Sequence, residues 1–391
     1  MGGLEGYVYP NEQELTWSVL IAVYPFITGL VAGAFILASL EKVFDVKALR
    51  PTYRISLLAA LAFLLAAPLP LLAHLHQPLR GYEIMATPNP TSAMAVFGFV
   101  YLWYLTAILL VEIWLEFRVD IVKKAEAAKG MVRAFYYALS LGVTDTSDEA
   151  RHTDHRIATV VTILGIPSAI LLHGYVGFIF GSVKANPWWS SVLMPVVFVF
   201  SATVSGIALM MLIYMASCLI RRVRIDTDCV RAMATFLFYA LLVAFTLELL
   251  DTIHRTYEAE ESIDIIQALM HGKMFTSVVV VQIIMGSLVP LIALGVLQVV
   301  RMPDRWRIFL SAEMAILVLI GVFAMRWNVV IGGQLFSKSL RGFTIYKWEF
   351  MGREGLASAV LICVLPIVLF AIFAKILPPW YEAPESDGVP T

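Results

Sequence analysis

The sequence predicts an all-α membrane protein, a polytopic bundle of about nine transmembrane helices. Of its 391 residues, 60% are hydrophobic and only 15% are charged, whereas about 25% of the residues of a soluble domain are charged. The mean hydropathy is +0.82. Apolar runs of about 20 residues, the length that crosses a bilayer, recur along the whole chain. These observations exclude an ordinary soluble domain, and the near-zero net charge gives no indication of nucleic-acid binding.

Nine apolar segments are predicted to form the membrane spans, within one domain that covers residues 1–377. We expect them at 17–40, 54–76, 92–117, 157–182, 189–220, 231–253, 274–300, 306–331 and 355–377. The first apolar segment has full transmembrane length and no basic region before it. We therefore expect it to be a span rather than a cleavable signal.

The distribution of Lys and Arg predicts that the N-terminus faces outward and the C-terminus lies in the cytoplasm. The segments 41–54, 118–156, 221–231 and 301–307, together with Lys375, hold 19 of the 28 Lys and Arg residues. Such residues gather in cytoplasmic loops. The acidic residues before the first span then face outward.

Two segments outside the spans are substantial. Residues 118–156 are predicted to form a partly helical cytoplasmic loop, and residues 332–354 an outer loop rich in Gly, Lys and aromatic residues. The polar tail 378–391 is predicted to be disordered.

Polar residues from five predicted spans converge at one depth, in the outer half of the membrane. His173 lies just past the middle of the fourth span, with Tyr175 nearer the outside. The other members of the set are His74, His76, Glu248, Asp251, Arg255, Gln282 and Arg326. An ionisable group at the bilayer centre costs about 2.5–3.5 kcal/mol on insertion scales, so such groups usually face a bundle interior or a cavity. The sequence therefore predicts a polar cavity in the outer half, flanked by aromatic residues.

The same residues also have purely structural interpretations. Arg326 could form a buried ion pair with Glu248 or Asp251, and His173 could donate one hydrogen bond to a carbonyl without titrating. The three cysteines lie far apart and only one histidine lies deep. We therefore expect neither an iron–sulfur cluster nor a bis-histidine haem in this chain.

Four motifs follow one another along most of residues 17–355. They are WSVLIAVYPFITGLVAGAF at 17–35, LHQPLRGYEIMATPNPTSAMAVFG at 75–98, HGYVGFIFGSVKANPWWSSVLMPVVFVFSATVSGIA at 173–208 and LIGVFAMRWNVVIGGQ at 319–334. Together they resemble the NrfD/PsrC family. The details HLHQP, HGYVGFIFGSVKANPWW and RWNVVIGGQ are most similar to its DsrP/HmcC branch, the quinone-interacting membrane subunits of sulfur-metabolism redox complexes.

The resemblance implies a fold of two four-helix bundles, here with an extra ninth helix that flanks the site. It implies a subunit of the cell inner membrane that has no redox centre of its own and binds exchangeable menaquinone near the periplasmic face. The implied partners are a periplasmic, DsrO-like four-cluster ferredoxin and DsrM-, DsrK- and DsrJ-like subunits.

The resemblance also implies which residues bind the quinone. The tyrosine of a Tyr-x-Gly motif in the fourth span matches Tyr175, and the eighth-span arginine matches Arg326. Where the family has a histidine before the first span, this chain has QELTW, which makes Glu14, Thr16 and Trp17 the candidates to replace it. Where many relatives have Asp-Leu-Gly-Arg-Pro, this chain has His-Leu-His-Gln-Pro, which begins at His74.

Quinol oxidation releases protons, so the site needs hydrogen-bond donors and a base. We expect Tyr175 to donate to one quinone oxygen, and His173 or His74 to accept a proton, because imidazole titrates near neutral pH. A stronger hypothesis is proton translocation through buried carboxylates and hydroxyls. The residues of that hypothetical pathway are Glu112, Glu313, Ser201, Ser205, Glu248 and Asp251.

Two alternatives from other functional classes remain open. One is a secondary transporter, for example of an anion, in which Arg326 and Lys184 act as counter-charges. Transporters of this kind contain inverted repeats, and the second half of the chain shows no convincing repeat of the first. The other is a pure membrane anchor without quinone chemistry.

Overall fold

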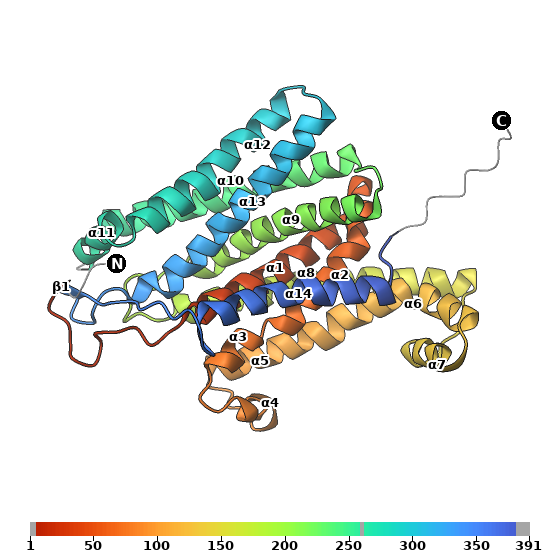
Figure 1. Ribbon diagram of the computed structural model, residues 1–391, viewed down its shortest axis with the longest axis horizontal. Coiled ribbons are helices and arrows are strands. Elements are labelled where there is room, and N and C mark those ends of the chain that lie inside the picture. The colour runs from red at the N-terminus through yellow and green to blue at the C-terminus, as the bar shows by residue number, and fades with distance from the viewer. Residues whose placement is uncertain (1–4, 259–261, 381–391) are drawn as a thin grey trace.

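The computed structural model describes residues 5–258 and 262–380 and shows a long α-helical bundle (Figure 1). Nine helical segments of this part of the chain are long and apolar enough to cross a membrane, which confirms the predicted polytopic bundle. They are α1 (Val19–Lys42); η1 (Lys47–Leu49), α2 (Arg50–Ala66) and α3 (Leu69–His74); α5 (Ala93–Trp103), η3 (Tyr104–Leu109) and α6 (Leu110–Ala127); α8 (Asp148–Gly181); α9 (Met194–Arg221); α10 (Thr227–Glu258); η4 (Phe275–Leu288) and α12 (Val289–Val299); α13 (Asp304–Val330) and η5 (Gly332–Gln334); and α14 (Leu356–Ile376).

The third and fourth spans continue as helices into the region 118–156. α6 ends at Ala127 and α8 begins at Asp148, where the Ser147 side chain caps the helix by accepting a hydrogen bond from the Ala150 N–H. The separate helix α7 (Gly130–Leu139) lies between them. Of the tail predicted to be disordered, residues 381–391 lie outside the described part of the chain.

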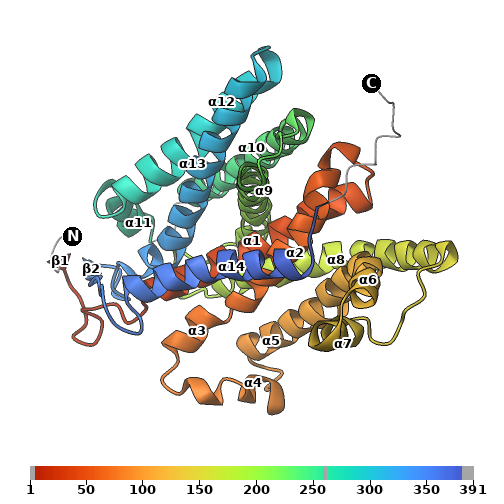
Figure 2. The same cartoon turned by 45° about the vertical axis from the view of Figure 1, so that its right-hand side comes forward.

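The spans form two groups, spans one to four and spans five to eight, and α1 joins them. α1 packs on α2 and α8 of its own group and on α9 and α13 of the other (Figure 2). Its contact with α9 depends on two glycines, since a Cβ on Gly33 would lie 2.0 Å from the carbonyl oxygen of Ala202 and one on Gly206 would meet Gly33. Small residues at crossings allow such close approach in membrane bundles.

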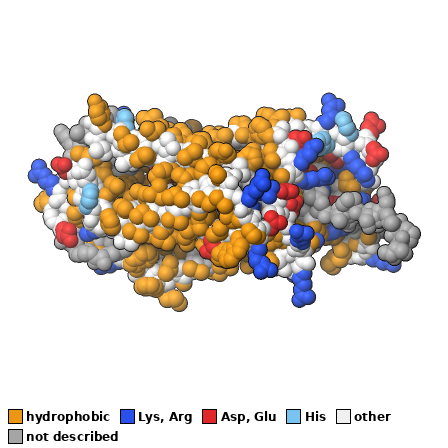
Figure 3. All heavy atoms as spheres, turned by 90° about the horizontal axis from the view of Figure 1, so that it is seen from above, with side chains coloured by type: hydrophobic (Ala, Val, Ile, Leu, Met, Phe, Trp, Pro, Cys, Tyr) orange, Lys and Arg blue, Asp and Glu red, His pale blue; other side chains and the backbone are white. Residues whose placement is uncertain are grey.

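The ninth span, α14, packs on the outside of the first group. It contacts α2 most extensively and also α1 and α3. The face that points away from them exposes large apolar side chains such as Leu361 and Ile367. Figure 3 shows hydrophobic side chains over the middle of one face of the molecule and charged side chains toward its two ends, the pattern of a protein that crosses a bilayer.

The N-terminal segment and the loop after η5 lie together at the end of the bundle that the charge distribution predicts to face outward, called the outer end below. β1 (Glu5–Gly6) pairs in antiparallel fashion with β2 (Gly342–Phe343), and a further bridge joins Glu14 to Ile345. The short elements η2 (Pro78–Arg80) and α4 (Glu83–Ala86) follow α3, and α11 (Ile263–His271) precedes η4. η3 and η4 are π-helical, a conformation that often occurs at functional sites.

Candidate functional site

His173 and Arg326 form the centre of a buried polar cluster where α8, α9 and α13 meet. The Arg326 Nη2 donates to Nε2 of His173 at 2.9 Å and to Oγ of Ser201 at 2.5 Å. Both His173 and Arg326 are fully buried. Because a guanidinium has donors only, Nε2 accepts and the imidazole proton lies on Nδ1, 3.4 Å from the Thr28 hydroxyl.

Phe198 closes this cluster. The Arg326 guanidinium lies 4.0 Å from the centroid of the Phe198 ring, and His173 stacks on the same ring at 5.6 Å. Among the described residues no carboxylate lies within ion-pair distance of Arg326. The buried ion pair considered for Arg326 with Glu248 or Asp251 is therefore not what the structure shows.

Tyr175 lies on a different side of α8 from His173, because two residues advance a helix by about 200°. Its ring stacks on Phe97 of α5 at 6.2 Å, and Phe97 makes an edge contact with Tyr24 of α1 at 5.8 Å. The Tyr24 hydroxyl is buried and has no hydrogen-bond partner within the described residues. We refer to Tyr24, Phe97 and Tyr175 as the aromatic group.

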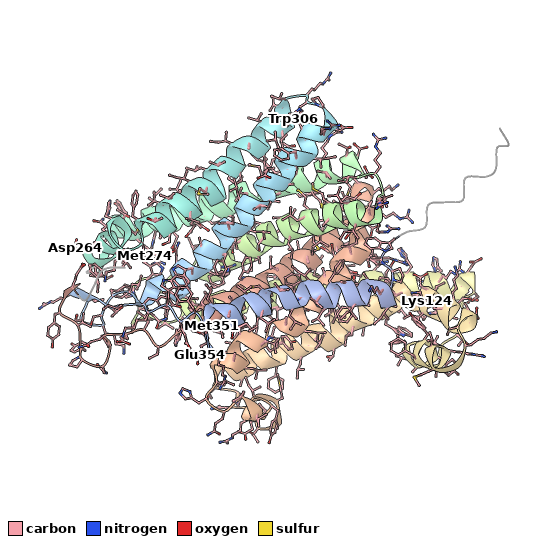
Figure 4. All side chains as sticks on the ribbon, viewed as in Figure 1. Lys124, Asp264, Met274, Trp306, Met351 and Glu354 are labelled. Atoms are coloured by element: carbon pink, nitrogen blue, oxygen red, sulfur yellow. The ribbon has the colours of Figure 1, made fainter. Side chains whose placement is uncertain are left out.

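Trp17 and His74 lie nearer the outer surface. Trp17 stacks on Trp189 at 5.6 Å and meets Phe180 edge-on at 6.4 Å. His74 Nδ1 lies 2.6 Å from the carboxylate of Glu354, a residue just before α14 that is labelled in Figure 4. The structure thus brings His173 and Arg326 together and places Tyr175, Trp17 and His74 in separate contacts.

A second polar cluster lies in the second group of helices. The Gln282 Nε2 on η4 donates to Oε2 of Glu248 on α10 at 3.0 Å, and the Asn328 Nδ2 on α13 donates to Oε1 of Gln282 at 2.7 Å. These residues line a cavity of about 260 Å³ between α9, α10, α11, η4 and α13. Asp251 lines it too, held by the Ser191 hydroxyl at 2.5 Å and by Arg255 at 3.0 Å.

A small void of about 20 Å³ lies between the two polar clusters. Ser201 and Glu248 both line it. The Arg326 cluster and the Glu248 cluster are therefore neighbours, although no hydrogen bond within the described residues joins them.

The inner carboxylates lie apart from these clusters. Glu112 is buried and accepts hydrogen bonds from Thr162 at 2.8 Å and Tyr53 at 3.1 Å. Glu313 is exposed on the surface of α13, and Ser205 donates to the carbonyl of Ala202 within its own helix. The described hydrogen bonds do not join the residues of the hypothetical proton pathway into one chain.

Sequence reasoning missed Tyr24 and Asn328 as site residues, and it placed Gln282 among the converging polar residues without giving it a role. The available signal was the hydroxyl or amide itself, since each lies inside an apolar run and Asn328 follows Arg326 by two residues. What the sequence could not supply was the contact between helices that leaves the Tyr24 hydroxyl and the Asn328 Oδ1 without partners in the described part of the chain.

The outer face carries its own charged contacts. Glu12 accepts hydrogen bonds from the Ser337 hydroxyl at 2.7 Å and the Lys338 N–H at 3.1 Å. Partial burial raises the pKa of Glu12, but these hydrogen bonds and the Lys338 ammonium outweigh it and hold the pKa below its usual value. Nearby, Trp327, Tyr346 and Trp348 pack together beside a cavity of about 290 Å³.

One family profile and several curated proteins are similar to this chain. The profile described as "Polysulphide reductase, NrfD" matches residues 8–338. A selenate reductase subunit of Mesobacillus selenatarsenatis is 32% identical over 204 residues, which cover 51% of this chain and 48% of that protein. A putative dimethyl sulfoxide reductase membrane subunit of Halobacterium salinarum is 28% identical over 227 residues, 54% of this chain and 48% of that protein. The chain spans about half the length of these two relatives.

A third relative matches nearly the whole chain. The Hdr-like menaquinol oxidoreductase integral membrane subunit of Archaeoglobus fulgidus is 22% identical over 406 aligned positions, which cover 95% of this chain and 91% of that protein.

Proposed function

This chain belongs to the NrfD family of polysulphide reductase membrane proteins, and from that premise we propose that it is the quinone-binding membrane subunit of a redox complex. The complex serves sulfur metabolism in the cell inner membrane. The subunit binds menaquinol near the periplasmic face and passes its electrons to a periplasmic, DsrO-like four-cluster ferredoxin, alongside DsrM-, DsrK- and DsrJ-like subunits. The name of the Archaeoglobus relative, a menaquinol oxidoreductase membrane subunit, supports this assignment.

The observation that carries the proposal is the buried Tyr24 hydroxyl without a partner among the described residues. A buried donor left unsatisfied costs about 1–3 kcal/mol, so such a group usually has a partner. A quinone oxygen is an acceptor that the hydroxyls of both Tyr24 and Tyr175 suit, and both rings contact Phe97. We infer that the quinone head binds against the aromatic group, with its oxygen atoms toward these hydroxyls.

When bound, menaquinol supplies two electrons and two protons to the site. In this proposal Tyr24 and Tyr175 orient the head by hydrogen bonds, and Trp17 lies at the outer level beside Phe180. His173 acts as a positioning residue, because its Nε2 accepts a hydrogen bond from Arg326 and is therefore not available to a ligand.

His74 is the candidate proton acceptor at the outer surface. Its Nδ1 lies 2.6 Å from the Glu354 carboxylate, and both side chains are partly exposed, so the pair has access to water. Proton translocation across the membrane would require ordered water between Glu112 and the Glu248 cluster, since the described hydrogen bonds do not connect them.

The proposal is tested by binding of a short-tailed naphthoquinol to the purified complex. Tyr175→Phe and Tyr24→Phe should each weaken binding about three- to tenfold, the effect of one lost hydrogen bond. Tyr101→Phe is the matched control, because the Tyr101 hydroxyl donates to the Leu64 carbonyl and not to a ligand. Equal affinity in all three variants would place the quinol outside the aromatic group.

A further inference from the structure

The cavity of about 260 Å³ between α9, α10, α11, η4 and α13 lies outside the proposed quinol site. Its walls are mostly apolar, and its polar groups converge from α10, η4 and α13. Leu249, Thr252 and Thr256 line it and are also exposed on the surface of α10. Part of the cavity wall is therefore also exposed on the surface of α10, a helix that we expect to face lipid.

The polar wall is an ordered chain of hydrogen bonds with a fixed direction. Glu248 accepts from the Gln282 Nε2, so the Gln282 Oε1 is free to accept from the Asn328 Nδ2. An amide nitrogen can only donate and an amide oxygen can only accept, so the orientation of both amides follows from the carboxylate at the end of the chain.

This direction leaves one acceptor unsatisfied. The Oδ1 of Asn328 has no partner within the described residues, and Asn328 is only 2% exposed. Buried polar atoms in native proteins nearly always have a partner. The missing partner must bring an O–H or N–H group, because another carbonyl oxygen cannot donate.

The π-helical form of η4 provides the opening. Gln282 lies in the middle of the fourteen-residue π-helix Phe275–Leu288, and Gly286 of this segment packs directly against Gly321 of α13. A π-helix is wider than an α-helix and often marks a functional site. Here it holds Gln282 between Glu248 and Asn328 while leaving space beside them.

We propose that this cavity binds a membrane amphiphile whose head carries a hydroxyl donor, with Asn328 accepting the hydroxyl proton in a hydrogen bond. The volume is slightly below the usual range of about 300–1,000 Å³ for ligand sites, so it admits a head of one or two rings and leaves the tail in the membrane. The same chemistry is offered by a reduced quinol and by the glycerol head of phosphatidylglycerol. The site is separate from the aromatic group, because it is built by the second group of helices.

The test measures binding of three probes to the purified protein in detergent: a short-tailed naphthoquinol, its oxidised naphthoquinone, and short-chain phosphatidylglycerol. It uses the Tyr24→Phe/Tyr175→Phe double variant as background, in which both hydrogen-bond donors of the proposed quinol site are absent, so that failure of that site is distinguishable from failure of this one. A hydroxyl-bearing probe should bind saturably, and Asn328→Leu should weaken it about three- to tenfold. The naphthoquinone, which has no donor, should show no such dependence on Asn328.

Thr252→Val is the matched control. Thr252 lines the same cavity, but its hydroxyl donates to the Glu248 backbone carbonyl within α10, so binding should not change. Dependence of the naphthoquinol on Asn328 identifies the quinol pool as the source, and dependence of phosphatidylglycerol identifies the lipid. If Asn328→Leu changes the affinity of neither hydroxyl-bearing probe, or if it weakens naphthoquinone binding as much as naphthoquinol binding, the proposal is wrong.

Discussion

The guanidinium of Arg326 donates to Nε2 of His173 at 2.9 Å, and both side chains are fully buried. The contact is specific in direction, since arginine supplies the proton and histidine the lone pair. A histidine at this depth is therefore an acceptor for a permanent cation, and it holds that cation against the Phe198 ring.

Removing the acceptor should destabilise the protein. His173→Leu leaves the Arg326 Nη2 with Ser201 as its remaining side-chain oxygen partner, and a hydrogen bond to a charged group contributes about 1.5–3 kcal/mol. We expect a loss of that size in the free energy of unfolding, measured in detergent. His271→Leu is the control, because His271 is exposed and its Nδ1 lies 2.8 Å from the backbone carbonyl of Gln267 in its own helix. Equal losses in the two variants would contradict the assigned contact.

Tyr24→Phe should weaken ligand binding without destabilising the ligand-free protein. Without ligand the Tyr24 hydroxyl is buried and unpaired within the described residues, so its removal should leave the thermal stability of the ligand-free protein unchanged or raise it. Naphthoquinol binding should weaken in the same variant. A clear loss of stability in the ligand-free protein would show that the hydroxyl has a structural partner.

Substitutions of Glu112 and of its hydrogen-bond partner Thr162 should have non-additive effects on stability. Thr162→Val removes a donor from buried Glu112 and should cost about 0.5–1.5 kcal/mol of unfolding free energy. In a Glu112→Leu background the same change should cost less, because no carboxyl group is left to accept the hydrogen bond. A double-mutant cycle measures the difference, and additive effects would rule out the contact.

The contact of Glu12 in the N-terminal segment with Ser337 and Lys338 in the outer loop should weaken in acid. The pKa of Glu12 is lower in the folded chain than in the unfolded one, so its contribution is complete above about pH 4.3 and is lost as the pH falls through the folded value. Hydrogen exchange at the amides of Tyr7 and Leu15, corrected for intrinsic rates, should therefore accelerate below that pH.

Glu12→Gln should remove this acid-induced change, whereas Glu14→Gln should leave most of it. Glu14 pairs with Lys347 on the exposed surface, where an ion pair contributes little. Acid-induced exchange that persists in Glu12→Gln would assign the titration to another group.

The crossing of α1 and α9 should not tolerate a larger residue at Gly206. The added methyl of Gly206→Ala would overlap the backbone of Gly33, so we expect a loss of about 1–3 kcal/mol in unfolding free energy. Gly295→Ala is the control, since its methyl would meet only the edge of the Phe238 ring. Similar thermal stability of the two variants would argue against the close crossing.

The sequence was sufficient to predict the nine spans, because each is an apolar run of membrane length. It also indicated that His173 and Arg326 are buried polar residues in the outer half. It did not indicate which neighbours they meet, because the rotation of each helix is set by packing against the others. His173 and Tyr175 are two residues apart and face different helices, and His74 meets Glu354, 280 positions along the chain. The π-helical form of η4 also has no signature in the apolar sequence that forms it.

One continuous helix, α8, carries contacts from both halves of the membrane. Asp154 meets Arg118, Thr162 meets Glu112, and His173 meets Arg326. Eleven residues, or about 16 Å of helix, separate Thr162 from His173, and Pro167 lies between them without a backbone donor. Pro167 cannot bond to the carbonyl one turn earlier, so the helix is expected to bend most easily there, between its contact with Glu112 and its contact with Arg326.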